Sequence, residues 1–369
     1  MKKIVFGITS LGFGGAERVL IDVVNNLASK YDITIFTLYG NGEFLKQIDE
    51  KITVKTIYTE KYSELGLLIR KKISLQMFSS SLRKRLYDKY IKGKYDVEIA
   101  FLEGPITWMF STPSDAIKIA WVHNDIERIF GEGRKARLKK RLNKKAYDNY
   151  NKIIFVSKDN KQKFEEMFPN NNVSKSIIKN YINKKIVVNK SKEKIDDMSN
   201  DLPSFVQVSR LVDQKGVYRL LSVHRELIDE GFAHRIYVVG GGPLKDDLSK
   251  KIEQYDLTDT FILLGEKDNP YPYIKSADYF MLTSLYEGYG MVVVEAEILN
   301  KYIMITDTAA REALEGYKND VVVDNSFDGI FDGIKKILRD KPTVDEDCNY
   351  NNDDIIDDIT SLLEGELWK

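Results

Sequence analysis

The sequence of 369 residues contains one cysteine, Cys348, and only three histidines. A single cysteine excludes a disulfide framework and a cysteine-rich metal cluster, so we expect a reducing, cytoplasmic compartment. Long apolar runs are also missing, and no stretch approaches the roughly 18 to 20 residues that a membrane-spanning helix needs. The apolar run KIVFGIT near the start soon gives way to a glycine-rich segment. It therefore indicates a first strand and not a signal peptide.

Net charge is absent as well, because 56 basic and 56 acidic side chains balance. The balance is uneven along the chain: residues 1–180 hold 33 basic and 20 acidic residues, and the remainder holds 23 and 36. This asymmetry suggests that only the first half meets an anionic partner. The length of the chain favours two domains.

Two segments account for much of the positive charge. Residues 66–95 hold nine basic residues and one acidic residue among interleaved apolar positions, and residues 134–145 hold eight basic residues and none acidic. A solvated helix face is the plain explanation of a charge run. Nucleic acid is disfavoured because no recognition motif accompanies the charge. The third interpretation, which we favour, is an anionic membrane surface. Each basic residue near such a surface contributes about 1 kcal/mol of binding free energy.

Strand-like apolar runs alternate with helical segments through most of the chain, which is typical of doubly wound, mostly parallel α/β sheets. The pattern starts again after a polar, charged stretch. We therefore predict an α/β protein with two Rossmann-like domains, divided into a first domain at 1–183, a linker at 184–202, a second domain at 203–345 and a terminal helix within 346–369.

A glycine-rich loop follows the first strand, with Gly12, Gly14 and Gly15 preceding an apolar helix. Glycine lets a backbone approach an anion at a helix start. The spacing is not that of a dinucleotide-binding fingerprint, and a tight turn without a ligand is the alternative. His123 likewise ends a predicted strand and is followed by Asn124 and Asp125. It is either a ligand contact or a neutral structural histidine.

In the second half, Arg210 and Lys215 lie in the loop after the strand at 204–208. A guanidinium can bind two phosphate oxygens and an ammonium adds a mobile charge, so together they could neutralise a diphosphate. An unliganded surface pair is the alternative.

The segment SLYEGYGMVVVEAE, residues 284–297, places two carboxylates around a small-residue turn. If the turn ends at Gly290 and a helix begins at Met291, the free N–H groups near Gly290, Met291 and Val292 suit a phosphate. Glu287 before the helix and Glu295 within it could accept sugar hydroxyls. The alternative interpretation is an ordinary helix N-terminus with an acidic residue beside it and no ligand.

These stretches resemble, in order, motifs of the retaining family 4 glycosyltransferases of GT-B fold. The segments SRLVDQKG and EGYGMVVVE carry the strong resemblance, and GGAE, WVHND and GGGP carry a weaker one. The resemblance implies two Rossmann-like domains facing a cleft and the roles of catalytic residues for His123, Arg210, Lys215 and Glu287. It further implies donor contacts by Gly14, Gly15, Gly241, Gly265, Glu266, Gly290, Met291, Val292 and Glu295. By the same analogy, the terminal helix within 346–369 would cross back to the first domain.

By this resemblance the protein would move a sugar from a nucleotide diphosphate to an acceptor hydroxyl, with retention and without a cofactor. No Asp-x-Asp follows a predicted strand, so we expect no metal site. With the basic segments, we expect a lipid-linked or cell-envelope glycan as acceptor, at the inner face of the membrane. A glycoside phosphorylase and a catalytically silent partner subunit of the same fold remain as alternatives.

Overall fold

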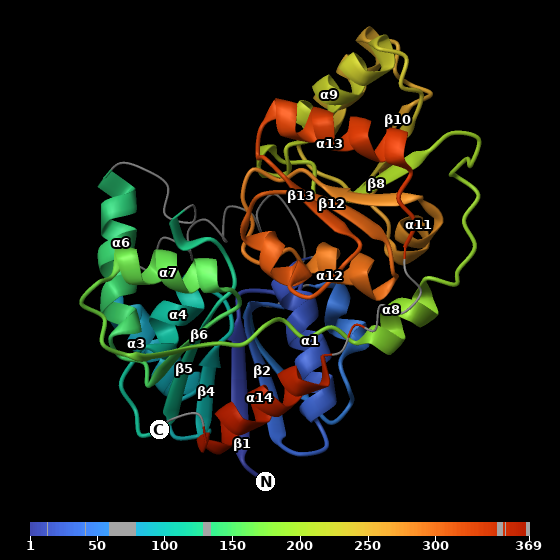
Figure 1. Ribbon diagram of the computed structural model, residues 1–369. Coiled ribbons are helices and arrows are strands. Elements are labelled where there is room, and N and C mark those ends of the chain that lie inside the picture. Colours follow the sequence, from blue (N-terminus) through green and yellow to red (C-terminus); the bar gives the residue numbers. More distant parts are fainter. Residues whose placement is uncertain are drawn as a thin grey trace. The chain divides into compact units, whose positions relative to one another are not determined.

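The computed structural model describes residues 1–12, 14–40, 42–58, 79–127, 134–344, 350 and 352–366. The chain divides into two compact units, of which the first is Met1–Ile182 with Asn352–Lys369 and the second is Asn183–Asn351 (Figure 1). Each unit is built on its own parallel sheet.

The first unit contains a seven-stranded parallel sheet in the order β3-β2-β1-β4-β5-β6-β7. Its strands are β1 Lys3–Ile8, β2 Asp32–Tyr39, β3 Thr53–Tyr58, β4 Val97–Ala100, β5 Ile117–Val122, β6 Lys152–Phe155 and β7 Ser174–Ile177. The order reverses between β1 and β4, as in doubly wound folds, and ligands bind such sheets outside the carboxyl ends of the strands.

Helices connect these strands: α1 Gly15–Leu27, the 3-10 helix η1 Glu43–Gln47, α3 Ser80–Tyr90, α4 Pro105–Phe110, α6 Arg134–Tyr147 and α7 Lys158–Met167. Side chains of α3, α4, α6 and α7 share one hydrophobic core with the sheet. The helix α14, Asp353–Glu364, completes this unit from the far end of the sequence. It is held by Lys2, which donates to the Leu363 carbonyl over 2.8 Å, and by Tyr31, which donates to Glu364 over 2.7 Å.

The second unit contains a six-stranded parallel sheet in the order β10-β9-β8-β11-β12-β13. Its strands are β8 Ser204–Val208, β9 Arg235–Val239, β10 Phe261–Gly265, β11 Tyr279–Leu282, β12 Tyr302–Thr306 and β13 Asp320–Val323. Its helices are α8 Lys184–Lys190, η2 Asp213–Lys215, α9 Val217–Asp229, α10 Lys245–Gln254, α11 Tyr271–Ser276, α12 Met291–Ile298, η3 Ala309–Leu314 and α13 Phe327–Asp340. The helices α9, α10 and α13 share a core with the sheet.

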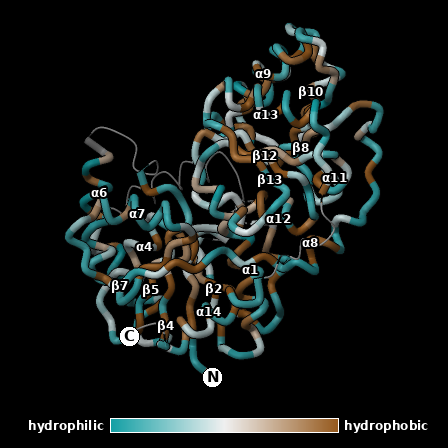
Figure 2. Tube along the Cα trace, in the orientation of Figure 1, coloured by the Kyte–Doolittle hydropathy of each residue, from teal (hydrophilic) through white to brown (hydrophobic). Residues whose placement is uncertain are grey.

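The strands form where the sequence places continuous apolar runs, because parallel strands are buried on both faces. Figure 2 shows hydrophobic residues along the strands of both units. The predicted α/β class with two Rossmann-like sheets is confirmed. The strand β7 was not predicted, because SKSI is polar and pairs with β6 at the sheet edge. The helix α8 lies within the stretch 184–202 that we predicted as a linker.

None of the described helices combines the length and apolar character needed to span a membrane. The first part of the basic segment 66–95, residues 66–78, lies outside the described residues.

Candidate functional site

The loop after β8 is shaped by Gly216, which lies between η2 and α9 with φ +66°. A Cβ at this position would lie 2.2 Å from the Thr283 carbonyl oxygen. Only glycine therefore allows the loop to pass so close to the end of β11. As a result Lys215, the residue before Gly216, lies next to the loop that follows β11.

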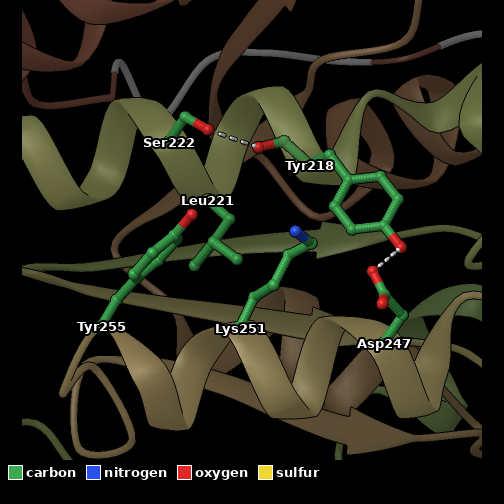
Figure 3. Close-up of a pocket in the computed structure, with 6 residues that line it drawn as sticks. All are labelled: Tyr218, Leu221, Ser222, Asp247, Lys251 and Tyr255. Atoms are coloured by element: carbon green, nitrogen blue, oxygen red, sulfur yellow. Dashed lines mark hydrogen bonds between the residues drawn. The ribbon is translucent and has the colours of Figure 1, made fainter.

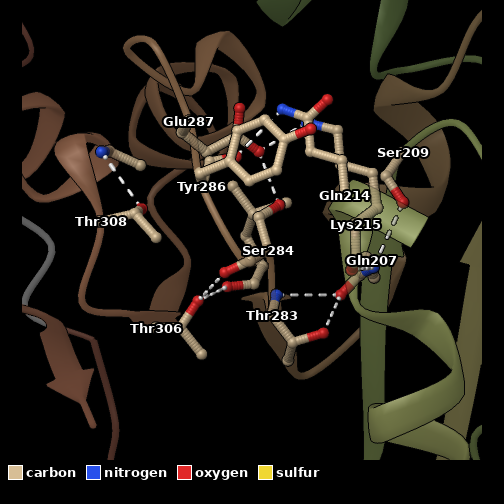
Figure 4. A network of polar contacts seen from close by, with 12 residues as sticks. Gln207, Ser209, Gln214, Lys215, Thr283, Ser284, Tyr286, Glu287, Thr306 and Thr308 are labelled. Carbon is tan, nitrogen blue, oxygen red and sulfur yellow. Dashed lines mark hydrogen bonds and ion pairs between the residues drawn. The ribbon is translucent and has the colours of Figure 1, made fainter. Parts of the chain in front are cut away.

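The loop between β11 and α12 carries Glu287, which is 7% exposed. Gly290 ends the loop with φ +79°, and α12 begins at Met291, as the sequence predicts. Ser284 donates its hydroxyl to Glu287 over 2.6 Å, and Thr306 donates to the Ser284 carbonyl over 2.7 Å. These bonds hold the carboxylate at the carboxyl edge of the second sheet (Figure 4).

The two loops meet in one ion pair between Lys215 and Glu287. The Nζ of Lys215 lies 2.5 Å from the Oε1 of Glu287, and both side chains are largely buried. Gln214 strengthens the contact, because its side chain donates to the Tyr286 carbonyl and its own carbonyl accepts from the Leu285 N–H. An ammonium has three N–H donors, so Lys215 retains donors for a second anion while it holds Glu287.

Arg210 lies two residues beyond β8 and is exposed. Within the described residues no carboxylate pairs with its guanidinium. Its neighbour Leu211 donates its backbone N–H to the Gly241 carbonyl over 2.8 Å, which joins this loop to the glycine turn after β9. The guanidinium is therefore available to an anionic ligand at this edge of the sheet.

The glycine turn also adjoins the end of β10. A Cβ at Gly241 would lie 3.3 Å from the Oε2 of Glu266, and Gly265 before it has φ +74°. The sequence-predicted donor residues Gly241, Gly265 and Glu266 therefore come together. Glu295 lies apart from Glu287 on α12, where it is 8% exposed and accepts from the Tyr271 hydroxyl over 3.2 Å.

In the first unit, Gly14 caps α1 with extended backbone, and Gly15 is its first residue. A Cβ at Gly14 would lie 2.1 Å from the Oε2 of Glu17. The Glu17 carboxylate thus covers the amide end of α1, where the sequence predicts a phosphate neighbour. This acidic side chain is the glutamate of the GGAE motif, and its position over the helix start was not predicted from the sequence.

His123 follows β5 and is 7% exposed, with its ring 5.9 Å from Trp121 in a stacked arrangement. Neither ring nitrogen has a hydrogen-bond partner among the described residues. Burial lowers the pKa of His123 to about 3, so the ring is neutral near pH 7. Glu103, which was not predicted from the sequence, accepts from the His123 N–H over 2.6 Å and the Asn124 N–H over 2.9 Å. Burial raises the pKa of Glu103, and these donors oppose that change.

The sequence of the chain is similar to those of known glycosyltransferases. The model of the family described as "Glycosyl transferases group 1" matches residues 188–355, which contain Arg210, Lys215, Glu287 and Glu295. The N-acetylgalactosamine-N,N'-diacetylbacillosaminyl-diphospho-undecaprenol 4-alpha-N-acetylgalactosaminyltransferase of Campylobacter jejuni is 25% identical over 345 residues, covering 92% of this chain and 91% of the relative. The part of the chain from 188 to 355 thus matches the group 1 glycosyl transferases.

Solved structures agree on the fold. Sucrose-phosphate synthase from Thermosynechococcus elongatus matches with a TM-score of 0.74 at 14% identity, over 92% of this chain and 90% of that one. HepE from Anabaena, in a complex with UDP and glucose, matches with a TM-score of 0.70 at 17% identity, over 92% of this chain and 91% of that one. The chain therefore has the GT-B fold predicted from its motifs.

A separate groove of about 450 Å³ lies between α9 and α10 and contains none of the predicted site residues (Figure 3). Its polar lining is largely paired within the protein. Tyr218 donates to Asp247 over 2.5 Å, and Ser222 donates to the Tyr218 carbonyl over 3.1 Å. The predicted site residues of the second unit thus lie at the carboxyl edge of its sheet and not in this groove.

The described residues contain no group of three or more His, Cys, Asp or Glu side chains placed to hold a metal ion. Sequence reasoning also missed the side chains that support the predicted ones, chiefly Gln207, Tyr271 and Ser284. A polar residue within an apolar strand is the signal that could have found Gln207.

Proposed function

We propose that this glycosyltransferase moves a sugar, with retention and without a metal ion, from a nucleotide diphosphate to a hydroxyl of a lipid-linked or cell-envelope glycan. The observation that carries the proposal is the Lys215–Glu287 pair at the carboxyl edge of the second sheet. Lys215 offers cationic donors to a diphosphate, and Glu287 offers carboxylate oxygens to sugar hydroxyls. The two groups lie side by side, as a nucleotide-diphosphate sugar requires.

In the proposed reaction the bond between the anomeric carbon and the diphosphate oxygen breaks, and a bond to the acceptor oxygen forms on the same face. The acceptor proton passes to the departing phosphate. Arg210 and Lys215 stabilise the negative charge that grows on that leaving group, which is the effect that preorganised donors supply best. Glu287 holds donor-sugar hydroxyls and Glu295 holds the ribose, so neither carboxylate attacks the sugar.

The remaining predicted residues would place the donor. Backbone N–H groups near Gly290, Met291 and Val292 would receive the diphosphate. The neutral ring of His123, whose nitrogens have no partner among the described residues, would bond a sugar hydroxyl. The turn formed by Gly241, Gly265 and Glu266 would border the nucleotide. UDP is the first nucleotide to test, because HepE of Anabaena was crystallised with it.

The acceptor class is supported by one relative and one helix. The Campylobacter jejuni relative is named for a diphospho-undecaprenol substrate. The helix α6, which contains the basic segment 134–145, exposes Arg137, Lys140, Arg141, Lys144 and Lys145 around Leu138, which is 51% exposed. A basic face with an exposed apolar side chain suits the interface of an anionic membrane. Nucleic acid is not proposed as a partner.

The decisive experiment offers the purified protein UDP-, GDP- and ADP-sugars and measures thermal shift and transfer or hydrolysis. Binding at 100 times Kd adds about 2.7 kcal/mol of stability, so a bound donor is easily detected. NMR of the product's anomeric proton reports retention or inversion, and turnover in a chelator tests the metal-free mechanism. Phosphorolysis of a disaccharide by inorganic phosphate would favour the phosphorylase, and binding without turnover would favour a silent subunit.

Vesicle binding tests the membrane proposal separately. Vesicles with anionic lipid should sediment the wild-type protein at low salt, and Lys140→Gln/Arg141→Gln/Lys144→Gln should weaken that binding. The matched control neutralises three exposed lysines of the second unit, Lys245, Lys250 and Lys318. Equal binding by both triple variants would remove the support for α6 as a membrane contact.

A further inference from the structure

We infer that Gln207 is a positioning residue that sets Lys215 in place against the loop of Glu287. This inference rests on the proposed function and deepens it. Gln207 lies on β8 in the sequence SFVQV and is fully buried. Burying an amide is costly unless all its hydrogen bonds are made, so an apolar residue would serve the core at lower cost. The reason for an amide must lie in what it bonds.

Four hydrogen bonds fill the capacity of the Gln207 amide (Figure 4). Its Oε1 accepts from the Thr283 N–H over 3.1 Å and from the Thr283 hydroxyl over 3.0 Å. Its Nε2 donates to the Ser209 hydroxyl over 3.2 Å and to the Lys215 carbonyl over 3.2 Å. The orientation of the amide is fixed, because the reverse orientation would set its oxygen against the Lys215 carbonyl and its NH₂ against the Thr283 N–H.

These bonds join the two halves of the ion pair. One end of the amide holds the backbone of Lys215, and the other holds Thr283, whose next residue, Ser284, bonds Glu287. Lys215 is therefore fixed at its backbone by Gln207 and at its ammonium by Glu287. A misplacement of about 1 Å at a reacting group can cost about 10²-fold in rate. The amide thus acts on the reaction through Lys215, without touching the donor.

The test is a double-mutant cycle of Gln207→Met and Lys215→Ala. Methionine keeps the length of the glutamine side chain and removes its hydrogen bonds. Affinity for UDP, GDP and ADP is measured by calorimetry, and kcat and KM are measured with the sugar nucleotide that the wild type uses. We expect Gln207→Met to lower kcat/KM by about 10- to 100-fold, mainly in kcat, and to change it less than about twofold in the Lys215→Ala background. A merely structural role would give independent, additive losses.

Ser204→Ala is the matched control. Ser204 is also buried on β8 and ties it to β11 through Asp278, at the opposite edge of the sheet, over 2.8 Å. It should cost stability but leave kcat, KM and diphosphate affinity unchanged. If Gln207→Met does not fold, Thr283→Val replaces it, because this change removes one of the four hydrogen bonds. We expect Thr283→Val to lower kcat/KM by about threefold to tenfold, and only when Lys215 is present.

Wild-type kinetics in Gln207→Met, or in Thr283→Val if that variant is used, would overturn the inference while leaving the proposed function intact. Additive losses in the cycle would overturn it equally. A wild-type protein that neither binds the three diphosphates nor turns over their sugars would instead remove the proposed function, and the positioning role with it.

Discussion

Lys215 donates to Glu287 over 2.5 Å, and Ser284 donates to the same carboxylate oxygen over 2.6 Å. The two charged residues are 72 positions apart in the sequence and come from the loops after β8 and β11. The negative charge of Glu287 therefore acts directly on the cation proposed to bind the diphosphate. Changes at these two positions should have different effects on nucleotide binding and on transfer.

Glu287→Gln is expected to lower transfer by about 10²- to 10³-fold, by analogy with the loss of one preorganised polar group. It should also tighten the binding of the nucleoside diphosphate alone, because Lys215 is no longer partly neutralised. Lys215→Ala should lower the rate of transfer and also weaken the binding of the nucleoside diphosphate. Calorimetry with UDP, GDP and ADP and initial-rate kinetics measure the two effects. Equal loss of diphosphate affinity in both variants would contradict the assigned roles.

Arg210→Ala is expected to lower kcat by about 10²- to 10³-fold with little change in stability. The side chain is exposed, and substitutions at such positions usually change the free energy of unfolding by less than about 0.5 kcal/mol. Arg225→Ala is the control, since Arg225 is also exposed but lies over the Tyr255 ring at 4.4 Å, beside the groove between α9 and α10. It should keep wild-type turnover. Similar rates for the two variants would argue against a role for Arg210 in the reaction.

The sequence was informative where burial dictates residue type. Strands such as Lys3–Ile8 and Ser204–Val208 were predictable because both faces of a parallel strand are buried. The edge strand β7 was not, because it has one neighbour and a polar sequence. At the site, Lys215 and Glu287 could be named from motifs. Their direct contact could not, because it depends on how closely Gly216 passes the Thr283 carbonyl, which no local pattern specifies.

A buried ion pair in the first unit gives a prediction about stability. Lys118 on β5 lies 2.5 Å from Glu98 on β4, and the Tyr87 hydroxyl, which lies 2.8 Å from each oxygen of that carboxylate, shares its one hydrogen with them. Burial lowers the pKa of Lys118, and Glu98 opposes that change. Lys118→Met would leave a buried carboxylate without its cation, which should cost about 3 to 5 kcal/mol.

Urea unfolding measures this cost against two further variants. Lys118→Met/Glu98→Leu removes both charges and should be more stable than the single variant, because replacing a whole buried pair is often neutral. Lys84→Met on α3 breaks an exposed pair with Asp88 over 2.6 Å, and such pairs contribute only about 0.3 to 0.5 kcal/mol. A cost for Lys118→Met as small as that of Lys84→Met would show that the buried pair is not what stabilises these strands.

A histidine pair in the core of the second unit should make the protein sensitive to acid. Both rings are fully buried, and the His224 Nδ1 lies 2.9 Å from the His234 Nε2. The bond from the His234 Nδ1 to the Phe232 carbonyl assigns the tautomers, because that nitrogen must carry hydrogen. His224 then donates through Nδ1, and its Nε2 accepts from the Thr260 hydroxyl over 2.9 Å. Each ring is neutral, and an added proton would break one of these bonds.

Burial lowers the pKa of His224 to about 2, with a further contribution from His234, and lowers the pKa of His234 to about 4. An unfolded histidine titrates near pH 6.5, so below that pH the unfolded chain binds more protons than the folded one. The contribution of the neutral histidine pair to the free energy of unfolding is therefore fully present above about pH 6.5. It falls as the pH decreases toward the pKa values of the two histidines in the folded protein. Each histidine should cost roughly 1.4 kcal/mol per pH unit in this window.

Urea unfolding of the wild type and of His224→Gln/His234→Gln between pH 7 and pH 4.5 tests this expectation. The double variant should be less stable at pH 7, because the chain of hydrogen bonds is altered, but its stability should fall less steeply with acid. His123→Gln is the comparison, since burial also lowers the pKa of His123, to about 3, and this ring lies in the other unit. His123→Gln should reduce the pH dependence of the free energy of unfolding only by the contribution of His123 itself. An unchanged slope in the double variant would assign the acid sensitivity to the carboxylates instead.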